Sequence, residues 1–271
     1  MKVGDILYLF LKLNIWLCLT SSLMVVATAV ALSIPLSAVG VGALLPPLLF
    51  YFIYVEDRRT VSDEDWINQP RRSRLVQQYG DELLITEIVA LVVYELLLVG
   101  LVLFRAGMGL EAVLFGQLPL LVLAVYGRLK RYPSFDSTAV GATWSFVTVF
   151  AVLVSTGHPV NQTVVAVFVA WFVIVFAGVE SRNLNDVEGD TESDKTTLAG
   201  YLGERPTKVM EGLLKIIGVA IFWQLSSVLV ASIVVVYLVS LRCFRFATQR
   251  VELTAAGRRR PIFSWVHREN E

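Results

Sequence analysis

Long apolar blocks separated by polar connections dominate the chain. Most blocks approach the length needed to cross a bilayer, and they lack the alternation of half-buried strands. We therefore predict eight transmembrane helices, at residues 7–32, 36–55, 83–104, 110–126, 138–155, 164–179, 209–222 and 226–241. The expected fold is an all-α, polytopic transmembrane bundle formed by residues 1–250, followed by a basic cytoplasmic tail at 251–271.

Positive charge falls on alternate connections. All but two of the 23 Lys and Arg residues lie at the start of the first predicted helix, after even-numbered helices, or in the tail. The exceptions are Arg105 and Lys215. The positive-inside rule then places both termini and the long connections 56–82 and 180–208 on the cytoplasmic side of the cell membrane. The composition agrees with an integral membrane protein, because 56% of the residues are hydrophobic. The formal net charge of zero gives no indication of a nucleic-acid partner.

The connection 180–208 opens with a polar segment. Residues 180–190 contain four acids and two asparagines. At about 100° per residue, Asn183, Asp186 and Asp190 share one face of a helix. Oxygen-bearing side chains are the ligands of Mg²⁺, which proteins often hold with one or two carboxylates and substrate phosphates. The alternative is a helix that becomes polar simply because it leaves the membrane.

The connection 56–82 combines acids with arginines. It begins with Glu56 and Asp57 and continues to Arg71 and Arg72. Arginine suits bidentate recognition of phosphate, so this loop is a candidate partner of the other acidic segment. A purely topological role for the arginines is the alternative interpretation.

These segments resemble a known family. Residues 183–190 are similar to the second aspartate-rich motif, Asp-x-x-Asp-x-x-x-Asp, of the UbiA superfamily of intramembrane prenyltransferases, especially its archaeal lipid-synthesis branch. Asn183, Asp186 and Asp190 take the three positions. Residues 126–133, with Lys130 and Arg131, and residues 68–72 also resemble segments of that family.

The family's first motif, Asn-Asp-x-x-Asp-x-x-x-Asp, is degenerate in this chain. Counting back from Asn68 without gaps gives the register Asp57, Arg58, Val61 and Asp65; a shift by one gives Glu56, Asp57, Thr60 and Glu64. Neither register restores every acid. The predicted eight helices also fall one short of the family's nine.

The resemblance implies a site and a reaction. Magnesium would be held by Glu56, Asp57, Asp186 and Asp190, of which Asp57, Asp186 and Asp190 would be catalytic. The diphosphate of a polyprenyl donor would be bound by Asn68, Arg72, Lys130, Arg131, Asn183 and Lys195. Ionisation of the donor would give an allylic carbocation, which a lipophilic acceptor attacks. We therefore predict that Asp57, Asp186 and Asp190 meet over one cavity.

Two other functions stay open at this point. Loss of the first motif would suit a prenyl-lipid-binding or assembly protein that kept the fold without catalysis. A small-molecule transporter could use Glu95, a charged residue inside the third predicted helix, but the hydropathy pattern has no clear inverted repeat. Glyceryl-phosphate lipids, quinone precursors, carotenoids and haem are all acceptors in the superfamily, so the resemblance does not select one.

Overall fold

The computed structural model describes residues 3–61, 65–66, 69–104, 109–129, 132, 134–192, 197–226 and 228–255. Within these ranges, the side chains at 3–4, 185–186, 188–192, 226, 228, 244–245 and 247–255 are not described. All secondary-structure elements in the described ranges are helices, which confirms the predicted all-α class.

The helices follow the apolar blocks closely. In chain order they are α1 (Val3–Lys12), α2 (Ile15–Ala31), α3 (Leu36–Val39), the short 3-10 helix η1 (Gly40–Leu44), α4 (Leu45–Arg59), α6 (Pro70–Gln78), α7 (Gly80–Phe104), α8 (Glu111–Gly116), α9 (Leu118–Leu129), α10 (Phe135–Thr156), α11 (Gln162–Glu192), α12 (Leu198–Leu202), α13 (Glu204–Ser226) and α14 (Val228–Ala255).

Only some of the described helices are long and apolar enough to cross a membrane. Among the described residues, five are long and apolar enough: Leu36–Arg59, Gly80–Phe104, Glu111–Leu129, Phe135–Thr156 and Gln162–Leu184. The bent pair α1 and α2 makes a sixth if it is one span. α14 carries a shorter apolar stretch, Leu229–Cys243, and α13 is not among these segments. The count of eight spans therefore stays a prediction.

Local sequence explains the bend between α1 and α2 and the start of α4. Asn14 separates α1 from α2 in a left-handed backbone conformation, with φ 59° and ψ 28°. Asn tolerates this region better than most residues because its short polar side chain can hydrogen-bond locally. The two helices consequently meet at a bend of 51°. Pro46 and Pro47 lie in the first turn of α4, where a missing backbone N–H costs nothing.

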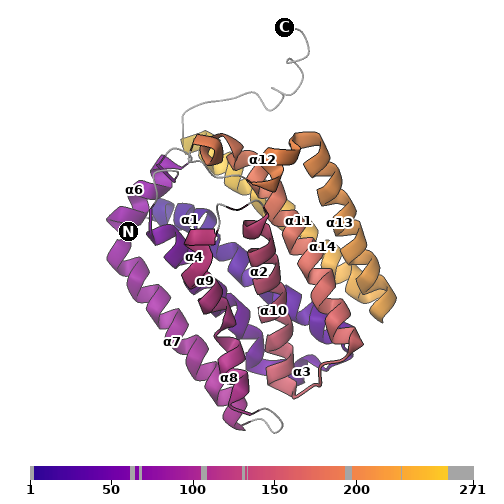
Figure 1. The fold of residues 1–271 in the computed structure, drawn as a ribbon. Helices are drawn as coiled ribbons and strands as arrows, with labels where there is room; N and C mark the ends of the chain where they lie inside the picture. Colours follow the sequence, from indigo (N-terminus) through magenta and orange to yellow (C-terminus); the bar gives the residue numbers. More distant parts are fainter. Residues whose placement is uncertain are drawn as a thin grey trace.

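The core is organised around α10 and α11, which cross the middle of the bundle (Figure 1). Trp171 of α11 is fully buried, and its indole Nε1 donates a hydrogen bond to the Thr28 hydroxyl of α2 at 2.9 Å. The rings of Phe222 in α13 and Tyr237 in α14 pack against the indole with centroids 4.9 and 5.5 Å away. One side chain thus joins four helices, and burying an aromatic of this size contributes about 1.5–3 kcal/mol.

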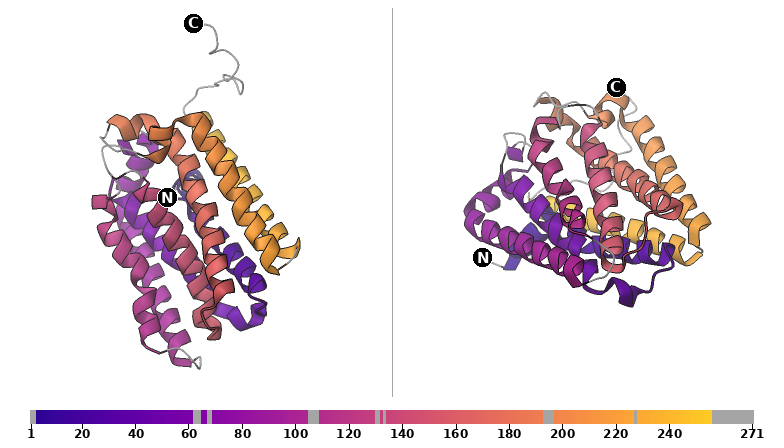
Figure 2. Two further views of the ribbon diagram at one scale, coloured as in Figure 1. Left: turned by 45° about the vertical axis from the view of Figure 1, so that its right-hand side comes forward. Right: turned by 60° about the horizontal axis from the view of Figure 1, so that its bottom comes forward.

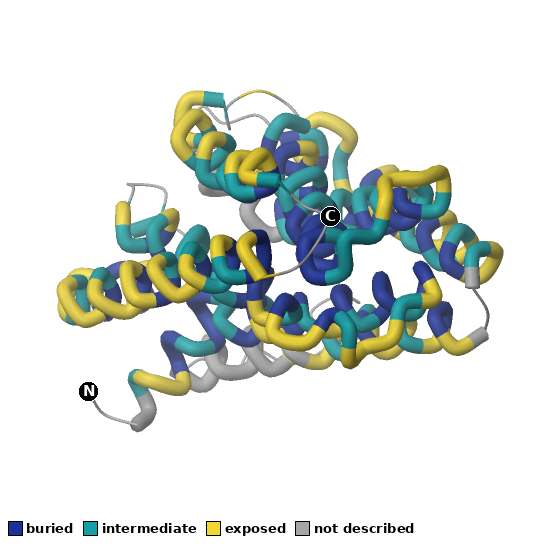
Figure 3. The backbone as a smooth tube through the Cα atoms, turned by 90° about the horizontal axis from the view of Figure 1, so that it is seen from below, coloured by how far each residue is buried: buried dark blue, intermediate teal, exposed yellow. Residues whose placement is uncertain are grey.

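The helices run roughly parallel to one long axis, with α6 and α12 at one end and α3 and α8 at the other (Figure 1). α13 and α14 lie side by side along one flank, and α7 lies along the opposite one (Figure 2). Exposed and buried residues alternate around most outer helices (Figure 3). On α7 most of the exposed residues are apolar, among them Ile88, Val92, Leu96 and Leu103. Such a surface suits contact with lipid.

Candidate functional site

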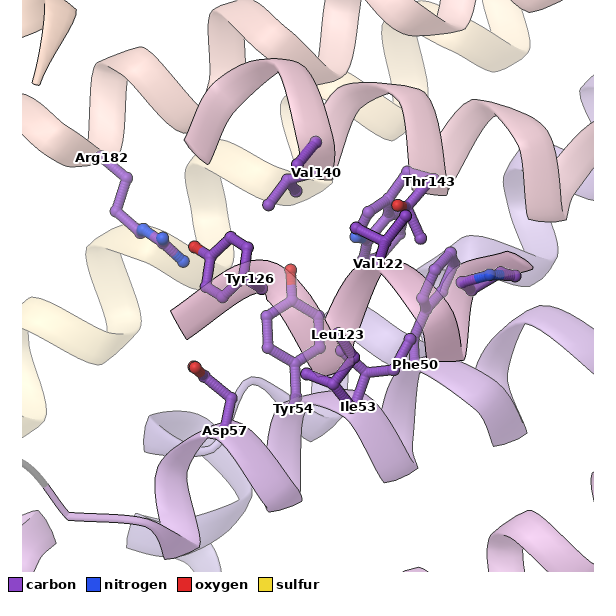
Figure 4. Close-up of a pocket in the computed structure, with 13 residues that line it drawn as sticks. Phe50, Ile53, Tyr54, Asp57, Val122, Leu123, Tyr126, Val140, Thr143 and Arg182 are labelled. Atoms are coloured by element: carbon purple, nitrogen blue, oxygen red, sulfur yellow. The ribbon is translucent and has the colours of Figure 1, made fainter. Parts of the chain in front are cut away.

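A cavity opens between four helices at the end of the bundle where α4 and α9 finish (Figure 4). It contains about 580 Å³ of space, its opening included. Its lining comes from α4 (Phe50, Ile53, Tyr54, Asp57), α9 (Pro119, Val122, Leu123, Tyr126), α10 (Ala139, Val140, Thr143, Trp144) and α11 (Arg182).

The two ends of the cavity differ in chemistry. At one end, Phe50 stacks on Trp144 with ring centroids 3.9 Å apart and an interplanar angle of 12°. At the other end, Asp57 and Arg182 approach from opposite helices, and the Arg182 side chain points toward Tyr126 (Figure 4). The cavity therefore combines an aromatic, apolar interior with a charged mouth.

The helical period of α4 decides which of its polar residues faces the cavity. Phe50, Tyr54 and Asp57 recur at helical spacing and share the cavity face. Glu56 lies on the α7 side instead, where its carboxylate accepts a hydrogen bond from Arg59 Nη2. Arg59 Nε also donates to the buried Glu87 of α7 at 2.8 Å. Asp57 is thus turned to the cavity, whereas Glu56 is held by an ion-pair network beside it.

Two arginines from the cytoplasmic connection predicted at 56–82 are buried. Arg58 is 9% exposed, and its guanidinium lies over the Tyr54 ring, 5.1 Å from the centroid. Arg72 of α6 is 6% exposed and donates a hydrogen bond to Asp65. Burial lowers the pKa of Arg72 from its usual value and the nearby Arg58 charge adds to this, while Asp65 opposes it. An arginine nonetheless keeps its proton in a protein.

The second predicted motif is described in part. Asn183 is 2% exposed, and its Nδ2 has no hydrogen-bond partner among the described residues. Arg182, the preceding residue, reaches the cavity that Asp57 also lines. The backbone of Asp186 and Asp190 belongs to α11, but their side chains lie outside the described part of the structure. Their predicted approach to Asp57 therefore stays a prediction.

The remaining predicted ligands fall outside the description. Asn68, Lys130, Arg131 and Lys195 all lie outside the described residues. Among the residues that the structure does describe, no three His, Cys, Asp or Glu side chains gather as a metal site.

A set of polar contacts connects the cavity-lining helices α9, α10 and α11. These contacts were not predicted from the sequence. Tyr126 donates its hydroxyl to Asp136 at the start of α10. Ser137, the next residue, donates to the fully buried Glu180 of α11, which also accepts the backbone N–H of Ala199 at 3.0 Å. Tyr126 lay in a segment that resembled the family, but no sequence pattern pairs Glu180 with Ser137 or Ala199.

Glu95, the residue on which a transport function would depend, has a local partner. Its Oε2 accepts a hydrogen bond at 3.0 Å from Gln117, which lies at the break between α8 and α9. It is not one of the residues that line the cavity. Glu95 is thus a hydrogen-bond acceptor that links α7 to the α8–α9 break.

Comparisons with known proteins identify a family and a similar fold. The sequence pattern of the family described as "UbiA prenyltransferase family" matches residues 83–266. The fold is similar to a solved structure described as "Structure of a UbiA homolog from Archaeoglobus fulgidus bound to DMAPP and Mg2+", with a TM-score of 0.58. The two chains are 18% identical, over 89% of this chain and 86% of the other, so this likeness concerns the fold alone. No curated protein matches the chain.

Proposed function

The chain belongs to the UbiA prenyltransferase family, and we propose that it moves a prenyl group from a prenyl diphosphate to a lipophilic acceptor inside the membrane. One observation carries this proposal: the cavity between α4, α9, α10 and α11 joins an apolar, aromatic interior to a charged mouth. A prenyl diphosphate has the same division, because an apolar chain is attached to a multiply charged anion. The two parts of the donor match the two parts of the cavity.

The charged mouth would receive the diphosphate. Arg182 reaches it from α11, and a guanidinium group can donate two parallel hydrogen bonds to phosphate oxygens. We propose Arg182 as an addition to the set predicted from sequence, which is Asn68, Arg72, Lys130, Arg131, Asn183 and Lys195. The buried Nδ2 of Asn183, which has no partner among the described residues, supports a role in binding an oxygen atom.

Magnesium fits the donor atoms that this end of the chain supplies. The side chain of Asp57 faces the cavity and is 42% exposed, so carboxylate oxygen is accessible to a cation. We propose that Asp57, Asp186 and Asp190, with Glu56 beside them, hold Mg²⁺, the ion bound together with DMAPP in the Archaeoglobus fulgidus homolog. When bound, Mg²⁺ would supply charge neutralisation at the departing diphosphate.

The aromatic wall would serve the transfer step itself. Transfer breaks the bond between the allylic carbon and the diphosphate oxygen, which keeps the electron pair. The carbon then bonds to a nucleophilic atom of the acceptor, which loses a proton. Tyr54 lines the cavity near its mouth, where positive charge would develop on the carbon, and aromatic faces attract cations. The apolar wall would also exclude water, a competing nucleophile.

The orientation in the membrane is part of the same proposal. We propose the arrangement predicted from sequence: eight spans, both termini in the cytoplasm, and the tail 251–271 against the cytoplasmic leaflet. The distribution of Lys and Arg supports it, and basic residues near anionic lipid contribute about 1 kcal/mol each. The charged mouth of the cavity would then open toward the cytoplasmic side.

A second function, donor binding without catalysis, is favoured by one feature of α4. In the ungapped register, Arg58 and Val61 replace two acids of the family's first motif, and the neighbouring Glu56 is engaged by Arg59. A protein of this kind would bind the diphosphate in a metal-dependent way and leave it intact.

Purified full-length protein distinguishes the two functions. It would be incubated with Mg²⁺, a radiolabelled prenyl diphosphate and a panel of lipophilic acceptors, and assayed for bound donor, released diphosphate and prenylated product. Transfer predicts Mg²⁺-dependent release of diphosphate together with product for at least one acceptor. Metal-dependent binding without release would instead establish the binding function, and no binding at all would contradict both.

A further inference from the structure

Arg58 is a buried cation next to the charged mouth of the cavity. It follows Asp57 on α4 and contacts two residues of the cavity wall. Its guanidinium lies over the ring of Tyr54, and its Nη1 is 3.6 Å from Oδ2 of Asp57. The distance to Asp57 is an ion-pair distance, longer than a hydrogen bond.

Two of the three guanidinium nitrogens of Arg58 have no hydrogen-bond partner among the described residues. Arg58 is 9% exposed, and its Nε and Nη1 are buried atoms that have no hydrogen-bond partner among the described residues. A buried guanidinium normally uses its N–H groups, because an unsatisfied charged donor loses its hydration without compensation. Stacking on one aromatic ring and a long ion pair compensate only part of this loss. Nε and Nη1 of Arg58 therefore lack a hydrogen-bond acceptor among the described residues.

The surroundings point to an anion as that acceptor. Arg58 and Arg182 are both close enough to Tyr54 to interact with it electrostatically, and Arg182 lines the same cavity from α11. Arg72, a third buried guanidinium, is in electrostatic range of Arg58. Neighbouring guanidinium groups repel one another, and negative charge placed between or beside them reduces this repulsion. An anion with several oxygens at the mouth would accept from Arg58 and Arg182 together.

We infer that Arg58 donates hydrogen bonds directly to the diphosphate of the donor, so that the α4 side of the site balances the anion with a guanidinium group. This inference rests on the proposed function. It also explains why an arginine can replace an acid of the family's first motif. Where a further acid would hold a second cation against the substrate, this chain places a cation of its own that is permanently charged and cannot dissociate.

Binding of inorganic diphosphate tests Arg58 apart from turnover. Full-length wild type, Arg58→Gln, Arg58→Lys and the control Arg74→Gln would be titrated by calorimetry, each with saturating Mg²⁺ and with EDTA. Arg74 is exposed on α6, so its replacement changes the net charge equally. We expect Arg58→Gln to weaken binding about 10- to 100-fold in both conditions, the value of a charged hydrogen bond. Arg58→Lys should weaken binding less, and Arg74→Gln should not change it.

A structural role for Arg58 would give a different result. Binding of DMAPP and of the matching uncharged alcohol would be measured for wild type and Arg58→Gln. Direct contact with the anion predicts weaker DMAPP binding and unchanged alcohol binding. Equal weakening of both ligands, or wild-type affinity for diphosphate in Arg58→Gln, would overturn the inference and leave the proposed function intact. Failure of the wild type to bind either diphosphate would instead contradict the proposed function, and the inference with it.

Discussion

Phe50 of α4 and Trp144 of α10 stack face to face across the apolar end of the cavity, with ring centroids 3.9 Å apart. Both rings line the cavity, and Phe50 lies far from Asp57 and Arg182 along it (Figure 4). A prenyl chain anchored at the mouth by its diphosphate would extend toward this pair. We therefore expect the stack to set how much chain the cavity accommodates.

Shortening Phe50 should change the preferred length of the donor. Phe50→Leu and Phe50→Ala open space beyond the first isoprene units, so we expect both variants to shift preference toward longer prenyl diphosphates. Competition between donors of increasing length would measure the shift. Phe50→Ala should also lower the free energy of unfolding by about 3–5 kcal/mol, because it leaves a cavity in the core.

The matched control is Phe146→Ala. Phe146 stacks on Phe150 of the same helix, with centroids 5.4 Å apart, and does not line the cavity. Its replacement removes the same side-chain volume without changing the donor site. A similar change of length preference in Phe146→Ala and Phe50→Ala would contradict a specific role for the Phe50–Trp144 stack.

Asp57 and Glu56 should differ in their effect on magnesium dependence. Asp57 faces the cavity, whereas the Glu56 carboxylate is engaged by Arg59 on the α7 side. We expect Asp57→Asn to raise the Mg²⁺ concentration needed for half-maximal turnover more than Glu56→Gln does. Titration of turnover with Mg²⁺ measures both effects. The opposite order would mean that Glu56 leaves Arg59 and is the main ligand on α4.

Glu180 should hold the short helix α12 in place. Its buried carboxylate accepts from Ser137 and from the Ala199 N–H, so Glu180→Gln brings an amide NH₂ toward one of these donors. A buried donor left unsatisfied costs about 1–3 kcal/mol. We expect a lower melting temperature and faster amide hydrogen exchange at Ala199.

Glu204→Gln provides the control for this prediction. Glu204 is exposed near the start of α13 and pairs only with Lys208 among the described residues, one turn further along the helix. Exposed pairs of this type contribute little to stability. Unchanged exchange at Ala199 in Glu180→Gln, or an equal increase in Glu204→Gln, would show that the carboxylate does not hold α12.

Cysteine labelling tests the proposed orientation. Thr60 follows α4 and Val160 precedes α11, and both are exposed. In a Cys243→Ser background, where the remaining Cys18 is buried, Thr60→Cys and Val160→Cys should react with an impermeant reagent from opposite sides of sealed vesicles. The positive-inside pattern places Thr60 in the cytoplasm. Reaction of both from one side would contradict the order of spans.

Much of the fold could be predicted because the membrane imposes a simple rule on sequence. A spanning segment must be apolar and helical, so the apolar blocks predict the described helices directly. The sequence is less decisive for α13. Residues 209–222 are predicted as a span, but polar residues lie among the apolar ones, and α13 is not among the described helices that are apolar enough to cross a membrane. The bend at Asn14 also escapes prediction, since a single left-handed residue leaves the hydropathy pattern unchanged.

The candidate site could be predicted only in part, because its contacts join distant segments. Helical spacing alone would have grouped Phe50, Tyr54 and Asp57 on one face of α4. In contrast, the engagement of Glu56 depends on Arg59 and on Glu87, which another helix supplies. Arg58 likewise resembles a topological arginine in the sequence, and its burial becomes visible only when α4 and α6 are packed together.

Turnover by two variants tests metal-assisted prenyl transfer at the acidic segment of α11 most directly. Diphosphate release from a labelled prenyl diphosphate would be measured for wild type, Asp186→Asn and Asp190→Asn, with Glu188→Gln as a control on another face of the helix. Metal ions supply several kcal/mol of charge stabilisation, so each Asp variant should lose about 100-fold or more of the rate while Glu188→Gln keeps most of it. Wild-type rates of release in both Asp variants would contradict the proposed mechanism.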